Sequence, residues 1–172
     1  MDAGRSRRVD WACAVRAYHQ TMVRKIASGG QTGVDRAALD VALELGIPCG
    51  GWCPRGRLAE DGVIPSRYPL DETPTDRYRQ RTEWNVRDSD GTLALVRGAP
   101  RGGTALTLRR AEAMDRPRHV VDLADGPDPD AVRLWMAVHA IRVLNVAGPR
   151  ESESPGIHAA AADFLRRVFM GL

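Results

Sequence analysis

The feature that most constrains the fold is a glycine-rich segment, residues 28–33, between a β-prone stretch and an apolar helical face. Residues 22–26 favour a strand, and apolar residues recur at helical spacing from residue 37 until Gly46 and Pro48 end the pattern. Glycines let the backbone turn sharply and approach a ligand, and a helix N-terminus attracts an anion. The pattern therefore predicts a strand, an anion-binding turn and a helix. A tight turn without a ligand is the alternative, since the segment is neither a Walker A loop nor a GxGxxG sequence.

The rest of the chain alternates strand-like and helix-like segments. Strands are predicted over residues 47–52, 92–96, 119–123 and 143–147, and helices over residues 75–88, 105–114, 129–140 and 155–169, the last with Ser154 as N-cap. This alternation predicts an α/β fold with a mostly parallel, twisted sheet and helices on both faces. We expect a single domain over residues 22–172, with residues 1–21 as an extension that forms a helix on its surface.

Two more strand-to-helix turns are rich in glycine, at residues 101–104 and 148–156. In a parallel sheet these turns lie at the carboxyl edge of the strands, where ligands bind. Three such turns at one edge predict a cleft for a ligand that carries phosphate or another oxyanion. Arg101 and Arg150 are the better phosphate candidates, because a guanidinium binds an oxyanion through two hydrogen bonds.

Other charged residues have more than one interpretation. Asp35 suits a helix N-terminus, or it hydrogen-bonds to the sugar, pterin or base edge of a ligand. Arg36 binds an anion or pairs with Asp40 one turn later. No Ser-His-Asp set can be placed, and His158 is the histidine that could reach the cleft. Nothing in the spacing selects one acid or base among the candidate carboxylates, which are Asp35, Glu60, Asp61, Glu72 and Glu151.

The long segment of residues 53–75 is rich in proline, glycine and charge and shows no periodicity. A compact domain seldom contains so long an irregular connection unless it is functional or mobile. We expect it to cover a ligand; a solvated surface loop is the alternative.

The composition excludes several classes of protein. The net charge of +3 comes from arginines interleaved with acids, and Lys25 is the only lysine, so nucleic-acid binding is not expected. No apolar run approaches a membrane span, and residues 1–8 lack the apolar core of a signal peptide, which makes the cytoplasm the expected compartment. Three scattered cysteines predict neither a disulfide framework nor a metal site.

Several motifs resemble the family of molybdenum cofactor carriers. They are residues 28–40, Gly51-Trp52-Cys53-Pro54-Arg55-Gly56-Arg57, Glu72-Thr73, Tyr78, Arg81-Thr82, Asn85-Val86, Gly102-Gly103-Thr104 and Gly148-Pro149-Arg150-Glu151-Ser152. The resemblance covers residues 22–169 and implies a Rossmann-like three-layer fold related to the Lonely Guy phosphoribohydrolases. It also implies a homo-oligomer, a dimer or tetramer, that binds the molybdenum cofactor (molybdopterin), with molybdoenzymes as recipients.

On this resemblance, together with the glycine turns, a set of ligand-binding residues is predicted. They are Ser28, Gly29, Gly30, Gln31, Thr32, Gly33, Asp35, Arg36, Arg57, Glu72, Arg81, Asn85, Arg101, Gly102, Gly103, Thr104, Gly148, Arg150, Glu151 and Ser152.

The leading function is binding or carriage of the molybdenum cofactor or a related phosphorylated pterin or nucleotide. A nucleotide-processing enzyme, similar to a phosphoribohydrolase or glycosidase, is the alternative. The related hydrolases have a Gly-Gly-x-Gly-Thr-x-x-Glu turn, whereas the turn at residues 101–107 lacks the matching glutamate. The nearest glutamate is Glu112, in the helix, so hydrolysis would need another carboxylate such as Glu72 or Asp35.

Overall fold

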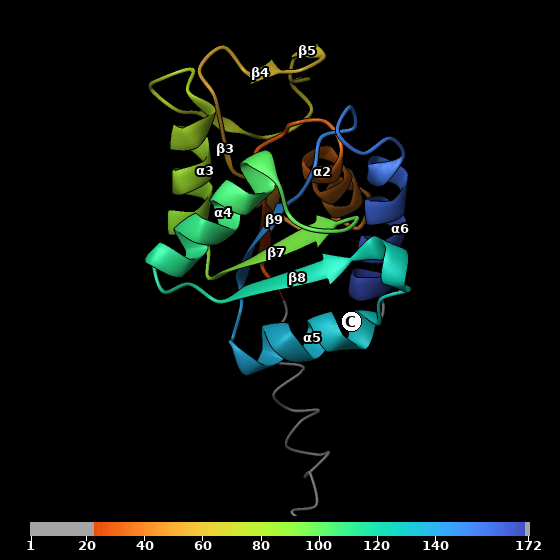
Figure 1. Cartoon of the computed structure of the whole chain (residues 1–172). Helices are drawn as coiled ribbons and strands as arrows, with labels where there is room; N and C mark the ends of the chain where they lie inside the picture. Colours follow the sequence, from red (N-terminus) through yellow and green to blue (C-terminus); the bar gives the residue numbers. More distant parts are fainter. Residues whose placement is uncertain (1–22, 171–172) are drawn as a thin grey trace, which may run out of the picture.

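A five-stranded parallel sheet forms the centre of the computed structural model, which describes residues 23–170 (Figure 1). The strand order is β2-β1-β9-β7-β8. The strands are β1 (Lys25–Ala27), β2 (Cys49–Gly50), β7 (Gly91–Val96), β8 (Arg118–Asp122) and β9 (Val143–Ala147). The chain passes from β1 outward to β2 and from β7 outward to β8, so the turns that follow β1, β9 and β7 lie side by side at the carboxyl edge.

Helices cover both faces of the sheet (Figure 1). They are α2 (Val34–Glu44), α3 (Tyr78–Arg87), α4 (Gly102–Ala113), α5 (Pro129–Val138) and α6 (Ile157–Met170), with a 3-10 turn η1 (Leu123–Asp125) after β8. Right-handed crossovers place α2 and α5 on one face of the sheet, and α6 packs against both of them there. On the other face, α3 and α4 pack against each other. The predicted Rossmann-like α/β fold is confirmed. Among the described helices, none combines the length and apolar character needed to cross a membrane.

The main core lies between the sheet and α2, α5 and α6. Ile26, Leu93, Leu95, Leu144 and Phe164 are completely buried there. Full burial of a side chain of this size contributes about 1.5–3 kcal/mol. A second, smaller cluster joins Leu39 of α2 to Cys53, Ile64, Tyr68 and Leu70, which anchors the long connection to the body of the domain.

That connection differs from the irregular segment expected from its sequence, because it contains short strands. β4 (Leu58–Ala59) pairs with β5 (Gly62–Val63), and β6 (Asp71–Glu72) pairs with β3 (Trp52–Cys53). Inside the loop, the Arg57 guanidinium donates hydrogen bonds to four backbone carbonyls, those of Ile64, Pro65, Tyr68 and Leu70. We call residues 54–72 the cover segment.

Other boundaries also differ from the prediction. The helix expected over residues 105–114 begins at Gly102, so most of the second glycine-rich turn belongs to α4. The strand expected over residues 47–52 is divided at Gly51, whose φ is 128° and where a Cβ atom would lie 2.3 Å from the Ser28 carbonyl oxygen. The last helix begins at Ile157 and not at Pro155, and Ser154 accepts the Ile157 N–H through its backbone carbonyl. Instead, the Glu151 carboxylate accepts hydrogen bonds from the N–H groups of Gly156 and His158. The expectations for residues 1–21 lie outside the described residues.

Candidate functional site

The turn after β1 packs directly against the turn after β9. A Cβ atom on Gly33 would lie 2.3 Å from the Pro149 carbonyl oxygen, and the φ of Gly33 is 76°. The Val34 N–H donates to that same carbonyl, over 3.3 Å. Only glycine fits this close approach and this backbone conformation. The contact brings the first and third glycine-rich turns together at one edge of the sheet.

The start of α4, which contains Gly102, Gly103 and Thr104 of the second glycine-rich turn, completes a small cavity that we call the inner cavity. Its volume is about 70 Å³. Gln31 of the first turn, Gly103 and Thr104 of α4, and Gly148 and Arg150 of the third turn line it. Asp35, Tyr78, Arg81, Thr107 and Glu153 are also part of its wall. Residues from all three glycine-rich turns therefore converge on one space.

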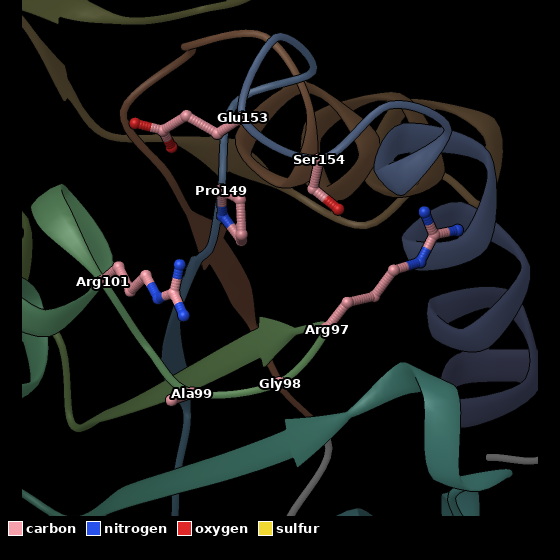
Figure 2. A pocket seen from close by; sticks show the side chains of 7 residues that line it. All are labelled: Arg97, Gly98, Ala99, Arg101, Pro149, Glu153 and Ser154. Atoms are coloured by element: carbon pink, nitrogen blue, oxygen red, sulfur yellow. The ribbon is translucent and has the colours of Figure 1, made fainter.

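A larger cavity, the outer cavity, lies between the loop after β7 and the turn after β9, with a volume of about 430 Å³ (Figure 2). Figure 2 shows Arg101 reaching into this space, whereas Arg97 turns toward α6. Arg97 is held there because its guanidinium donates to the carbonyls of Pro155 and Gly156. Glu153 lines both cavities, which places them side by side.

The helices that follow the glycine-rich turns differ in how their N-terminal N–H groups are used. The Glu151 carboxylate caps α6, and the Pro149 carbonyl occupies the first N–H of α2. In contrast, no side chain in the described part of the chain caps α4. A Cβ atom added to Gly103 would have no atom within 4 Å, so the space in front of α4 is open. The first N–H groups of a helix attract an anion, and of the three helices that follow the glycine-rich turns, α4 is the one whose first N–H is neither capped by a side chain nor bonded to another turn within residues 23–170.

Gln31 is a second polar residue in the wall of the inner cavity. The residue is 4% exposed. Its Oε1 accepts hydrogen bonds from the N–H groups of Thr32 and Glu60, at 3.1 and 2.9 Å, and this fixes the orientation of the carboxamide. Its buried Nε2 has no partner among the described residues. An unsatisfied buried donor costs about 1–3 kcal/mol, so a ligand acceptor in the cavity would relieve that cost.

A buried ion pair forms another wall of the inner cavity. The Arg81 guanidinium of α3 lies 3.0 Å from the Asp35 carboxylate of α2, whose side chain is 4% exposed. Burial raises the pKa of Asp35, and the Arg81 charge opposes this increase. A Cβ atom on Gly29 would lie 1.7 Å from Arg81 Nη1, so glycine at this position leaves room for the pair.

Several predicted ligand residues of the first and third turns hold the cover segment instead of lining either cavity. The Glu60 carboxylate accepts hydrogen bonds from the Thr32 hydroxyl and from the hydroxyl and N–H of Ser152. Desolvation of Glu60 tends to raise its pKa, but the hydrogen bonds from Ser152 and Thr32 outweigh this effect and lower it. Arg36 pairs with Asp61 through two hydrogen bonds.

Other predicted residues also bond to protein groups. The Ser28 hydroxyl donates to the Val146 carbonyl over 2.7 Å, and Asn85 bonds both the N–H and the carbonyl of Trp52. Glu72 accepts from the Gly56 N–H. His158 lies 2.9 Å from Asp40 of α2 and lines neither cavity. Within residues 23–170, no three His, Cys, Asp or Glu side chains cluster as a metal site would require.

Several residues that line the cavities are absent from the predicted ligand-binding set, among them Tyr78 and Glu153. Tyr78, the first residue of α3, is 38% exposed, and the Arg150 guanidinium lies over its ring at 5.2 Å. Glu153 lies in the third glycine-rich turn, three residues after Arg150. Its position inside that turn was the available signal, but nothing in the pattern distinguished it from Glu151.

Comparisons with known proteins agree with this architecture. The model of the circularly permutated YpsA SLOG family (cpYpsA) matches residues 26–169. A crystal structure from Syntrophus aciditrophicus SB, of a protein described as a candidate molybdenum carrier protein, is 50% identical in sequence, with a TM-score of 0.82. The similarity covers 86% of this chain and 95% of that one. A comparison with curated proteins gives no match. The chain belongs to the circularly permutated YpsA SLOG family.

Proposed function

We propose that the protein binds and carries a small phosphorylated ligand, either the molybdenum cofactor or a related phosphorylated pterin or nucleotide. The observation that carries the proposal is the N-terminus of α4, which has no side-chain cap within residues 23–170 and borders a cavity lined by Gln31, whose buried amide nitrogen has no partner in that range. Arg150 beside the inner cavity and Arg101 in the outer cavity add positive charge. A phosphate group is an acceptor for all of these groups.

The two cavities suit a ligand with two parts. The inner cavity, at about 70 Å³, has room for a group of the size of a phosphate, and the outer cavity, at about 430 Å³, has room for a ring system. The 50% identical neighbour, described as a candidate molybdenum carrier, supports the molybdenum cofactor as the ligand. A molybdenum centre would then be cargo, held through the organic part of the cofactor.

One residue of the inner cavity counts against the hydrolysis that the related enzymes perform with their turn glutamate. Thr107 lies three residues after Thr104, where the turn of the related hydrolases has its glutamate, and it lines the inner cavity. A threonine hydroxyl is a poor general acid or base at neutral pH. We propose further that the protein is a cytoplasmic homo-oligomer, a dimer or tetramer, and that molybdoenzymes receive the ligand.

The test is to purify the protein from a host that makes the molybdenum cofactor and to record its native mass spectrum. We expect a bound mass, fluorescence of a released pterin and stoichiometric molybdenum. Arg150→Ala should lose the bound mass, whereas Arg142→Ala, at the opposite edge of the sheet, should retain it. If the wild-type protein carries neither pterin nor molybdenum and binds no phosphorylated pterin or nucleotide in titration, the proposal is wrong.

A further inference from the structure

Glu153 has a position that no other carboxylate of the described chain shares, on the wall common to both cavities. Its Oε1 is the nearest atom to a Cβ position built on Gly102, at 3.8 Å, so its carboxylate stands in front of the first residue of α4. Figure 2 shows Glu153 on the turn after β9 and Arg101 at the start of α4, on two sides of the outer cavity.

The bonding of Glu153 leaves half of its carboxylate available. Oε2 accepts a hydrogen bond from the Arg150 N–H over 3.1 Å. Oε1 has no hydrogen bond to any residue of the described range 23–170, and the side chain is exposed. This oxygen can therefore accept a hydrogen bond from a bound molecule.

The charge of Glu153 has opposite effects on different ligands. A bare oxyanion at the N-terminus of α4 would lie close to this carboxylate, and two like charges within a few ångströms repel each other, least in water and more strongly where water is excluded. A phosphate ester whose organic part presents a hydroxyl or amine to Oε1 gains a charge-assisted hydrogen bond, which offsets this repulsion.

We propose that Glu153 determines the specificity of the site: it disfavours bare oxyanions and favours phosphate esters whose organic part carries a hydrogen-bond donor next to the phosphate. The inference rests on the proposed function, because it requires an anion at α4. It names the residue that makes the site discriminate between an inorganic anion and an organic phosphate. A carrier that works in the presence of free phosphate requires such discrimination.

The experiment measures the affinity of inorganic phosphate and of ribose 5-phosphate by calorimetry at constant ionic strength. The wild-type protein should bind ribose 5-phosphate more tightly than phosphate. In Glu153→Gln, phosphate should bind about tenfold more tightly and the preference for ribose 5-phosphate should shrink, since a nearby negative charge is removed. The glutamine keeps an acceptor for the Arg150 N–H, so the turn should retain its conformation.

Glu112→Gln is the matched control, because it removes the same charge from an exposed position paired with Arg118. It should leave both affinities unchanged. The inference is wrong if Glu153→Gln binds phosphate as tightly as wild type or more weakly. If ribose 5-phosphate still binds in that case, the proposed function stands. If wild type and Glu153→Gln bind neither compound, and phosphorylated pterins are not bound either, the proposed function itself fails.

Discussion

At the residue scale, the site depends on three glycines and on one amide whose nitrogen has no partner among the described residues. Gly29 leaves room for Arg81, Gly33 admits the Pro149 carbonyl, and Gly103 leaves open space in front of α4. These glycines thus have different physical roles, although they look alike in the sequence. Gln31, between two of them, has its acceptor oxygen fixed by backbone N–H groups, and its buried donor nitrogen has no partner within residues 23–170.

Gly29→Ala and Gly103→Ala should separate stability from binding. The alanine at position 29 displaces Arg81 and leaves the buried Asp35 carboxylate without its partner, so the free energy of unfolding should fall by about 3 kcal/mol. The alanine at position 103 meets no atom and should leave stability unchanged or raise it by up to about 1 kcal/mol. It should nevertheless weaken phosphate-ester binding, because its methyl group enters the space in front of α4. Urea denaturation and calorimetry measure the two effects; equal stability of both variants would contradict this account.

Gln31→Glu should reduce ligand affinity by about tenfold or more, since an oxygen replaces the unpartnered donor while the two accepted hydrogen bonds remain. Titration with a phosphate ester at pH 8, where the new carboxylate is charged, is the measurement. Gln80→Glu is the control, since that amide bonds Thr75, away from both cavities. An affinity equal to that of wild type would mean that the Gln31 amide does not contact the ligand.

At the scale of elements, the cover segment is held in place by acidic residues. Glu60 bonds Thr32 and Ser152, and Asp61 pairs with Arg36. The pKa of Asp61 is lowered, chiefly by the hydrogen bond from Arg36, and the pKa of Glu60 is also lowered. A carboxyl group whose pKa is lower in the folded state stabilises the fold above its unfolded pKa, and this stabilisation is lost as the pH falls through the folded pKa.

The cover segment should therefore loosen as the pH falls below the ordinary values of 3.8 and 4.5 for these groups. Hydrogen exchange of residues 58–63 between pH 7 and pH 3, corrected for the intrinsic rate, should show protection that decreases toward acid pH. Global stability is a poorer measurement, because Asp35, whose pKa is raised, has the opposite pH dependence. Protection that is constant over this range would show that these carboxylates do not hold the segment.

At the scale of the whole molecule, the sequence predicted the fold well because most of the sheet consists of short apolar runs bounded by turn residues. The predicted strand over residues 143–147 has the bounds of β9 in the structure. What could not be predicted depends on contacts between distant residues. The expected strand is divided at Gly51 because the Ser28 carbonyl lies against that residue. The hydrogen bond from Ser152 to Glu60 joins residues that are 92 positions apart in the sequence. Which helix N-terminus is open to a ligand depends on which side chains cap the others, and the sequence does not show this. The division into residues 1–21 and 22–172 stays a prediction.

Binding of the phosphate group at the N-terminus of α4 can be followed at single residues by titrating ¹⁵N-labelled protein with a phosphate ester and recording the amide resonances. We expect large downfield shifts of the Gly103 and Thr104 N–H signals, because these groups would donate to the phosphate. The N–H signals of Val34 and His158, which already donate to Pro149 and Glu151, should move little. Saturating binding that shifts Val34 or His158 and leaves Gly103 and Thr104 unchanged would contradict binding at the N-terminus of α4.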